Sequence, residues 1–363
     1  MALRRVSNPQ NPFISEAREW LECEPPDTKI EVYEEHAKSI LSENDSPDIP
    51  FRWSINPYRG CHHACAYCYA RPTHEYLGYG AGTDFDTKIV AKVNAAELLR
   101  KAFEKKSWQS ESICFSGVTD CYQPQEAVYK LTRGCLEVCL AHRNPVSIIT
   151  KGYLVIRDID LLAELNRVAG ARVYISLAFA DDATARLIEP GAPPPSRRLE
   201  AIRQLKAAGL RVGVMCAPII PGLNDTEMPE LLRLAAEAGA KSAGYTALHL
   251  PGNAAAVFLE RIKAALPLRA ERIENRVREM RNGALNDSRF GNRMRGEGNY
   301  WHGIRQLFNV CAVKYGLRSA HRTTRSTAAT KQDPSADLFT ALPAPIVKPT
   351  IAGRTIQLRL FDE

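Results

Sequence analysis

Short apolar runs alternate with amphipathic stretches through the middle of the chain. Each short run is rich in β-branched residues, and the stretch after it carries apolar residues at helical spacing, which is typical of β-strands followed by α-helices. The expected strands are 53–57, 113–118, 146–150, 172–179, 211–217 and 242–248. The expected helices are 95–105, 126–141, 161–169, 197–208, 228–238 and 254–265. This alternation predicts a parallel sheet with right-handed crossovers.

Six βα units fall short of the eight that close a complete barrel. We therefore predict an α/β fold, a partial (β/α)6 barrel of the TIM type, with a lateral opening that could admit a large substrate. In parallel α/β folds the functional residues lie on the loops after the carboxyl ends of the strands. We expect the chemistry of this protein on those loops.

Composition divides the chain into a barrel, residues 51–266, and four other segments. Residues 1–50 hold several turn formers and few apolar runs, which predicts an irregular, partly helical N-terminal extension. Residues 267–318 are basic with helical spacing. Residues 319–355 are rich in Ser, Thr, Ala and Pro, as flexible linkers are. Residues 356–363 are expected to form a C-terminal docking peptide.

The overall composition is that of an ordinary globular protein. The 363 residues are 45% hydrophobic and 25% charged, and no apolar run is long enough to span a membrane. The first residues lack the apolar stretch of a secretory signal. We expect a cytoplasmic location, where the 10 cysteines stay reduced and act as ligands, reactive thiols or core residues.

Three of these cysteines are closely spaced just after the first expected strand. Cys61, Cys65 and Cys68 form the pattern CxxxCxxC. Three thiolates can hold three irons of a 4Fe-4S cluster and leave the fourth iron open to a small molecule such as S-adenosylmethionine. The alternative is a structural zinc site that adds His62, but such sites draw a second ligand pair from a separate turn, and none follows. The spacing favours the cluster.

The motif CxxxCxYC on the first βα loop resembles that of the radical S-adenosylmethionine superfamily. More narrowly, the stretch 30–253 resembles a bacterial subgroup of the spore photoproduct lyase-like branch. The resemblance implies a 4Fe-4S cluster and S-adenosylmethionine as cofactors, with an electron donor such as flavodoxin or ferredoxin as partner. One electron then cleaves the cofactor and gives a deoxyadenosyl radical.

The resemblance also assigns cofactor-binding residues to the loops after later strands. Thr119 and Asp120 match positions that contact the amino group of the cofactor, and a carboxylate beside an ammonium suits that contact. Lys151 resembles the lysine that pairs with the cofactor carboxylate. A polar strand-end turn and a solvated lysine are the alternatives. The remaining assignments are Ser176 for the carboxylate or ribose, Ala217 for the adenine, and Tyr69 for cofactor contact and hydrogen relay.

One position departs from the lyase pattern. The lyase has a cysteine three residues before the loop aspartate, where it returns a hydrogen atom to the product radical, and this chain has Gly117 there. Cys121 is a candidate substitute, although its side chain is expected to point differently. The resemblance therefore carries over radical generation but not lyase activity on the thymine dimer.

Arginine residues are concentrated in the C-terminal third. The net charge of +7 favours a polyanionic partner but is too small to establish one. Arginine residues from Arg269 to Arg295, then Arg318, His321, Arg322 and Arg325, interleave with Phe290, Tyr300, Trp301 and His302. Arginine for phosphates and aromatic rings for stacked bases predict a nucleic-acid surface. A solvated charged face is the alternative, and the resemblance favours DNA.

The last residues contain a compact apolar motif. Gln357, Leu358, Leu360 and Phe361 resemble the bacterial sliding-clamp binding motif, Gln-Leu-x-Leu-Phe. A short peptide on a tether suits docking into a groove of a partner. The alternative is a final edge strand of the domain.

These expectations give one main hypothesis and two alternatives. The main hypothesis is an iron-sulfur enzyme that reductively cleaves S-adenosylmethionine and applies the radical to DNA, in lesion repair of the photoproduct lyase kind. The first alternative is a radical enzyme that modifies a protein or a small metabolite. The second is a non-catalytic, zinc-binding nucleic-acid adaptor.

Overall fold

The computed structural model describes residues 3–6 and 30–319 of the chain. Its main sheet has eight strands in the order β12-β11-β10-β9-β8-β7-β4-β3. They are β3 (Leu41–Glu43), β4 (Trp53–Ile55), β7 (Ile113–Phe115), β8 (Val146–Thr150), β9 (Ala171–Ser176), β10 (Arg211–Ile219), β11 (Ser242–Ala247) and β12 (Arg318–Ser319). Neighbouring strands are parallel except β3, which pairs antiparallel with β4.

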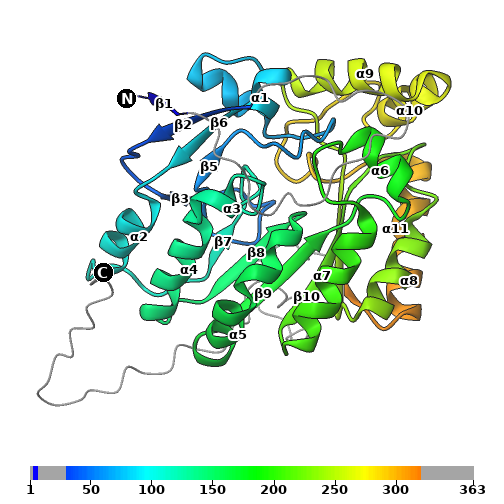
Figure 1. Ribbon diagram of the computed structural model, residues 1–363. Coiled ribbons are helices and arrows are strands. Elements are labelled where there is room, and N and C mark those ends of the chain that lie inside the picture. Colours follow the sequence, from blue (N-terminus) through cyan, green and yellow to red (C-terminus); the bar gives the residue numbers. More distant parts are fainter. Residues whose placement is uncertain (1–2, 7–29, 320–363) are drawn as a thin grey trace, which may run out of the picture.

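The prediction of an α/β fold of the partial-barrel type is confirmed. The six expected strands are present as β4 and β7 to β11, and each lies beside the one before it, as successive βα units require. Figure 1 shows α4, α5, α7 and α8 along one side of the curved sheet. The helices up to residue 265 are η1 (Arg71–Leu77, a 3-10 helix), α1 (Thr83–Thr87), α2 (Ala95–Phe103), α3 (Glu126–Tyr129), α4 (Leu131–Ala141), η2 (Tyr153–Asp158, also 3-10), α5 (Ile159–Val168), α6 (Asp182–Ile188), α7 (Pro195–Ala207), α8 (Met228–Ala238) and α9 (Ala254–Ala265).

The helix expected over 126–141 is broken into α3 and α4. Lys130, between them, has a φ of 52°, in the left-handed region that interrupts helical hydrogen bonding. The buried Glu126 carboxylate accepts the backbone N–H groups of Thr132 and Arg133 at 2.9 and 3.2 Å. A side chain thus satisfies donors at the start of α4 that an unbroken helix would pair internally.

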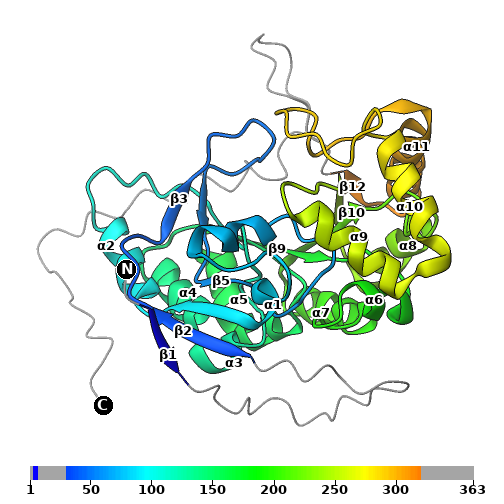
Figure 2. The same ribbon diagram turned by 90° about the horizontal axis from the view of Figure 1, so that it is seen from above.

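A second, smaller sheet covers the start of the barrel and was not expected. Its strand order is β1-β2-β6-β5. The strands are β1 (Leu3–Val6), β2 (Glu31–Glu35), β5 (Tyr58–Arg59) and β6 (Lys88–Lys92). The described residues up to 50 therefore contain the strands β1, β2 and β3 joined by irregular segments, and they contain no helix, in contrast to the expected partly helical extension. Figure 2 shows β1 and β2 beside β6 at one end of the molecule.

The C-terminal region packs against the far edge of the barrel. It contains α10 (Pro267–Glu279) and α11 (Gly298–Lys314), and β12 then extends the main sheet beyond β11. From α11, the rings of Phe308 and Trp301 lie 4.5 and 6.0 Å from the ring of Tyr245 on β11. This contact places the basic region against the barrel. Within the described ranges, no helix has the length and apolar character needed to cross a membrane.

Candidate active site

The three motif cysteines lie together on the loop between β5 and η1. Cys61 and Cys65 are buried and Cys68 is half-buried. Burial raises the pKa of Cys65 to about 12, and it also raises the pKa of Cys61, to which the charges of Asp120, Cys68 and Cys65 add. The three thiols are close enough for the charge of one to affect the others. Soft thiolates are the usual ligands of iron-sulfur clusters, and coordination deprotonates them.

No site for a single metal ion is found among the residues that the structure describes. Across the part of the chain that the structure describes, no group of three or more His, Cys, Asp or Glu side chains is arranged to hold a metal ion. The zinc alternative therefore gains no support from these residues. A 4Fe-4S cluster needs a wider arrangement, because each cysteine binds a different iron.

Arg71 is fully buried and forms hydrogen bonds to the backbone of the cluster loop. The Arg71 Nε and Nη2 atoms donate to the carbonyl oxygen of Cys65 at 3.2 and 2.8 Å. Its Nη1 atom donates to the carbonyl oxygens of Ala81 and Gly82, both at 2.9 Å. The carboxylate of Asp86 accepts from Nη2 at 2.8 Å. Because every direction of the guanidinium is used, the loop is fixed relative to the segment before β6.

Two further polar side chains hold the other parts of this loop. Arg261, from α9, donates to the carbonyl oxygen of Ala64 at 2.7 Å. The buried Gln123 amide donates to the carbonyl oxygen of Gly60 at 3.2 Å and accepts the N–H of His62 at 3.0 Å. Gly60 has a φ of 71°, and a Cβ there would lie 2.9 Å from a backbone oxygen. Glycine is therefore required directly before the first cysteine.

The segment after α6 packs directly on the cluster loop. The N–H of Gly191 donates to the carbonyl oxygen of His63 at 3.1 Å, and the N–H of Ala66 donates to that of Ile188 at 2.8 Å. A Cβ at Gly191 would lie 1.9 Å from the backbone oxygen of His62. This approach is possible only for glycine, so the fourth βα loop and the cluster loop form one unit.

The predicted cofactor residue Asp120 lies beside Cys61, but its carboxylate serves protein partners. Its oxygens accept from the Thr150 hydroxyl at 2.5 Å, the Tyr122 N–H at 2.9 Å and the Lys151 N–H at 2.7 Å. The Nδ1 atom of His63 lies 3.4 Å from the Oδ2 atom of Asp120. Burial opposes ionisation of Asp120, yet His63 and these donors hold its pKa well below the usual range. Asp120 is an anion that ties the β7 loop to the end of β8.

Thr119 is placed in the same way. Its hydroxyl donates to the carbonyl oxygen of Tyr58 at 3.0 Å, and the side chain is buried. Both side chains assigned to the cofactor amino group therefore stabilise the loop that borders the cysteines. Their contact with a cofactor stays a prediction.

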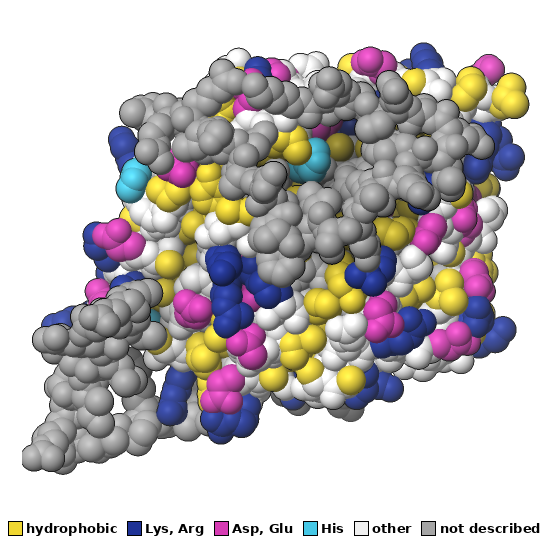
Figure 3. All heavy atoms as spheres, in the orientation of Figure 1, with side chains coloured by type: hydrophobic (Ala, Val, Ile, Leu, Met, Phe, Trp, Pro, Cys, Tyr) yellow, Lys and Arg dark blue, Asp and Glu magenta, His cyan; other side chains and the backbone are white. Residues whose placement is uncertain are grey.

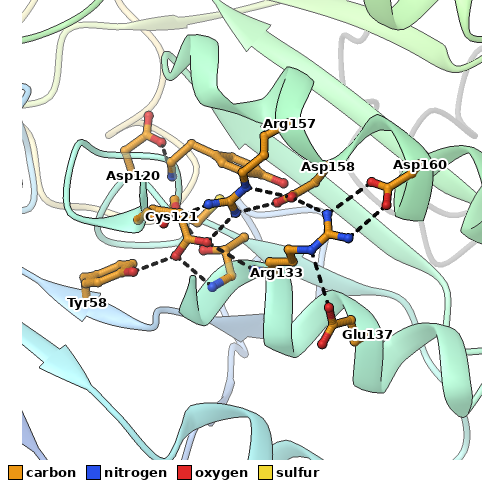
Figure 4. Close-up of polar contacts among 11 residues, drawn as sticks. Tyr58, Asp120, Cys121, Arg133, Glu137, Arg157, Asp158 and Asp160 are labelled. Atoms are coloured by element: carbon orange, nitrogen blue, oxygen red, sulfur yellow. Dashed lines mark hydrogen bonds and ion pairs between the residues drawn. The ribbon is translucent and has the colours of Figure 1, made fainter. Parts of the chain in front are cut away.

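Figure 4 shows a network of ion pairs and hydrogen bonds next to the loop that follows β7. The Tyr58 hydroxyl and Arg157 both donate to the Glu126 carboxylate at 2.6 Å. Asp158, which has no exposed side chain, pairs with Arg157 at 2.8 Å and with Arg133 at 2.9 Å. The network joins the strand before the cluster loop to α4 and to the start of α5.

Lys151, Ser176 and Ala217 lie along the carboxyl edge of the main sheet, as predicted. Ser176 ends β9 and Ala217 lies near the end of β10. The Lys151 ammonium lies 5.5 Å from the centre of the Tyr67 ring. Burial lowers the pKa of Lys151, but the charges of Cys65 and Glu189 outweigh it and leave that pKa raised. Lys151 is therefore a cation beside the cluster loop.

Tyr69 and Cys121, the two candidates for hydrogen relay, are placed very differently. The Tyr69 side chain is 45% exposed, and its hydroxyl donates to the carbonyl oxygen of Gly117 at 2.7 Å. Cys121 has no exposed surface and belongs to the main hydrophobic core, where burial raises its pKa well above the usual value. A Cβ at Gly117 would lie 3.1 Å from the Ser54 hydroxyl, so a side chain fits there only if Ser54 shifts. This placement favours Tyr69, and both relays stay predictions.

The loop between α10 and α11, residues 281–297, reaches across to the loop between β3 and β4, as Figure 2 shows. Arg293 pairs with Asp48 at 2.9 Å and donates to the Ser46 hydroxyl at 2.5 Å. Its guanidinium lies 4.7 Å from the Phe290 ring centre. Burial of the hydroxyl raises the pKa of Tyr69, and the charge of Arg293 opposes that shift. The Met294 carbonyl oxygen accepts the N–H of Ala247, the last residue of β11, at 3.1 Å, so the 281–297 loop lies at the carboxyl edge of the main sheet, as the candidate active site does.

The structure weakens the predicted nucleic-acid surface in part. Phe290 is 61% exposed, but Trp301 is 1% exposed and packs in the core, so the expectation of base stacking is wrong for Trp301. Its position on the inner face of α11 decides this. Many of the arginines are paired with carboxylates: Arg276 with Glu279, Arg278 with Glu274, Arg289 with Asp287 and Arg293 with Asp48. Figure 3 likewise shows basic and acidic side chains interspersed on one face.

In sequence, residues 55–235 match the family model of the radical SAM superfamily. The chain belongs to this superfamily. Radical SAM enzymes use a 4Fe-4S cluster and S-adenosylmethionine, so the predicted cofactors are confirmed at the level of the family, and the three clustered thiols suit the cluster. Sequence reasoning missed Arg71, Asp86 and Arg261, because these partners of the loop come from separate segments without a spacing pattern.

Similar proteins extend beyond bacteria. An uncharacterised protein of Mycobacterium tuberculosis is 42% identical over 233 residues, which cover 63% of this chain and 68% of that protein. One of Methanocaldococcus jannaschii is 32% identical over 200 residues, covering 55% and 72%. These relatives are uncharacterised and leave the substrate open.

The fold is similar to that of solved spore photoproduct lyase structures. The lyase complexed with dinucleoside spore photoproduct gives a TM-score of 0.57 at 15% identity, over 79% of this chain and 81% of that chain. A mutant of the lyase with bound AdoMet and dinucleoside spore photoproduct also gives 0.57 at 15% identity, over 80% and 82%. At this identity the comparison shows a shared fold.

Proposed function

We propose that this radical SAM enzyme applies its radical to DNA, in lesion repair of the photoproduct lyase kind. The observation that carries the proposal is the position of Tyr69. It follows the third cysteine and is 45% exposed, and its hydroxyl contacts Gly117, where the lyase pattern has the hydrogen-donating cysteine. A substrate that reaches the cofactors from the open side meets this residue.

The residues of the chain divide the work as follows. When bound, the cluster and S-adenosylmethionine supply a radical that abstracts hydrogen atoms. Cys61, Cys65 and Cys68 hold the cluster, and the Lys151 cation attracts the cofactor carboxylate. Tyr69 donates the hydrogen atom of its hydroxyl to the substrate radical, in place of the missing cysteine, and the resulting tyrosyl radical takes one electron from the electron donor and one proton from water to return to tyrosine.

DNA is supported by the 281–297 loop. Arg293 and Phe290 form a stacked pair beside Tyr69, with most of the Phe290 ring exposed. Arg293 is held by Asp48 and positions the ring, and an exposed ring can stack on a base that has left the duplex. The spore photoproduct lyase fold adds an analogy to this placement.

Release of deoxyadenosine tests the function. The chain is reconstituted anaerobically with iron, sulfide, reductant and S-adenosylmethionine, and incubated with irradiated DNA, unirradiated DNA, or neither. We expect irradiated DNA to increase release, with loss of a lesion, and Tyr69→Phe to keep release but reduce lesion loss. Equal release in all three mixtures, or greater release with a protein or metabolite extract than with DNA, would contradict the DNA proposal.

A sliding clamp is proposed as a second partner on the motif alone. Gln357, Leu358, Leu360 and Phe361 lie outside the described residues. We expect the full chain to retain a bacterial sliding clamp in a pull-down, and a Gln357→Ala, Phe361→Ala double variant to lose it. Equal retention by both would exclude the motif. A flavodoxin or ferredoxin as electron donor and a cytoplasmic location also stay predictions.

A further inference from the structure

A charged group with almost no exposed surface lies directly behind the cluster loop. Glu189 follows α6 and Arg198 lies in the first turns of α7, and each is 1% exposed. The Arg198 Nη2 atom donates to one oxygen of Glu189. The hydroxyl of Tyr67, between the second and third cysteines, donates to the other. We call these residues the Tyr67–Glu189–Arg198 triad.

The triad connects the cluster loop to two residues predicted to bind the cofactor. The Arg198 Nη1 atom donates to the carbonyl oxygen of Ser176 at 3.2 Å. The face of the Tyr67 ring carries the Lys151 ammonium. Tyr67, which bonds to Glu189, lies two residues after Cys65 and directly before Cys68, so these charges lie beside two of the cluster cysteines.

Within the triad, the negative charge of Glu189 cancels the positive charge of Arg198. Burial raises the pKa of Glu189, but Arg198 and Lys151 outweigh it, so the carboxylate is ionised and offsets Arg198. Among the described residues, Lys151 has no carboxylate within ion-pair distance. The pair therefore adds no net charge, and the Lys151 cation and the Asp120 anion, whose carboxylate accepts the Lys151 N–H at 2.7 Å, remain beside the cluster loop.

A buried ion pair needs an explanation other than stability. Withdrawing two charges from water is costly, and apolar residues of similar size often stabilise a core as well or better. Here the pair lies between a cluster ligand and two cofactor residues, where a change of one charge has large electrostatic effects.

We propose that Glu189 and Arg198 are positioning residues that set the charge beside the 4Fe-4S cluster. Because Glu189 neutralises Arg198, the pair adds no net charge to those of Lys151 and Asp120 beside the cluster loop. The cluster gains one negative charge when it accepts an electron, so a nearby cation favours the reduced state and an anion disfavours it. The pair therefore adjusts the reduction potential of the cluster.

Charge variants of the full chain, reconstituted anaerobically, test this role without any substrate. The midpoint potential of the cluster is measured by a redox titration followed by electron paramagnetic resonance. We expect Glu189→Gln to raise the potential and Arg198→Met to lower it. The double variant should return close to the original potential, as should the charge-preserving variants Glu189→Asp and Arg198→Lys.

A merely structural pair would behave differently. It would lose iron and unfold at a lower temperature in both single variants, without shifts of opposite sign. Variants that bind iron but leave the potential unchanged, or shift it in the same direction, would overturn the proposal. Arg233→Met on α8 is the control, since its ion pairs with Glu230 and Glu237 are remote and exposed.

If the single variants bind no iron, the variant Lys151→Met tests whether a charge at this place affects the potential of the cluster. It removes the cation and should lower the potential and weaken binding of S-adenosylmethionine to the oxidised enzyme, measured by calorimetry. An unchanged potential in that variant would overturn the proposal. The potential belongs to the enzyme without substrate, so this outcome is separate from that of the DNA assay.

Discussion

The cluster loop and the 281–297 loop border the same site but are held in opposite ways. The cluster loop is held by buried side chains, such as Arg71 and Gln123, whose polar groups bond to its backbone. The 281–297 loop has a buried anchor in Arg281, which donates to the carbonyl oxygens of Leu248 and Arg293 at 2.6 and 2.9 Å. Most of its other residues are half-buried or, like Phe290, exposed.

This difference indicates which side of the site tolerates change. A cofactor that must be held at a fixed distance needs a loop without alternative conformations, and buried polar contacts provide this because breaking one leaves an unpaired group. An exposed loop can vary without loss of the fold. We therefore expect radical generation to be set by the cluster loop and substrate choice by the 281–297 loop.

The largest expected effect is that of Arg71→Met. The substitution leaves the Cys65 carbonyl without its arginine donors and leaves the Asp86 carboxylate with Arg261 alone, so the free energy of unfolding of the metal-free chain should fall by about 3–5 kcal/mol. Denaturant unfolding measures this, and iron analysis should show poor cluster loading. The control is Arg233→Met on the surface of α8, which should change neither quantity appreciably. Full stability with normal iron content would show that the loop is not held by Arg71.

Asp120→Asn should have a smaller, pH-dependent effect. The folded state holds the pKa of Asp120 below its usual value, so ionised Asp120 stabilises the fold above the unfolded pKa of about 4. The variant should be about 2 kcal/mol less stable at pH 7, and the difference should narrow as the pH falls below about 4. Urea unfolding between pH 7 and pH 3 checks this. A difference that grows on acidification would reverse the assigned sign.

The smallest expected effect is that of Phe290→Ala on DNA binding. Loss of one stacked ring should weaken affinity for single-stranded DNA about tenfold, by the usual cost of removing a stacking contact. Fluorescence anisotropy at fixed salt measures it. Val313→Ala, at an 80% exposed position of α11, is the matched control. Deoxyadenosine release without substrate should be unchanged in both variants; a large loss in Phe290→Ala would mean that the two loops do not divide the work.

Much of the barrel could be predicted from the sequence. The strands β8 and β11 lie where their apolar runs predicted them, and the helix over 254–265 has the expected bounds. These elements are each one continuous amphipathic or apolar segment, so local periodicity is sufficient. The small sheet was missed because β2 and β6 are short and pair across more than fifty residues. The break at Lys130 was missed because the apolar spacing continues across it. The break depends on the Glu126 side chain, which accepts the N–H of Thr132 at the start of α4.

By itself, the sequence determined the family and the cofactor chemistry, because the spacing of Cys61, Cys65 and Cys68 is a local property that any fold of this type must respect. The tertiary structure alone decided what holds and tunes that chemistry. Arg71 below the loop and the Glu189–Arg198 pair behind it become partners of the cysteines only when separate βα units pack together. Their charges act strongly there because packing excludes water, and no local pattern records which side chains will share a buried space.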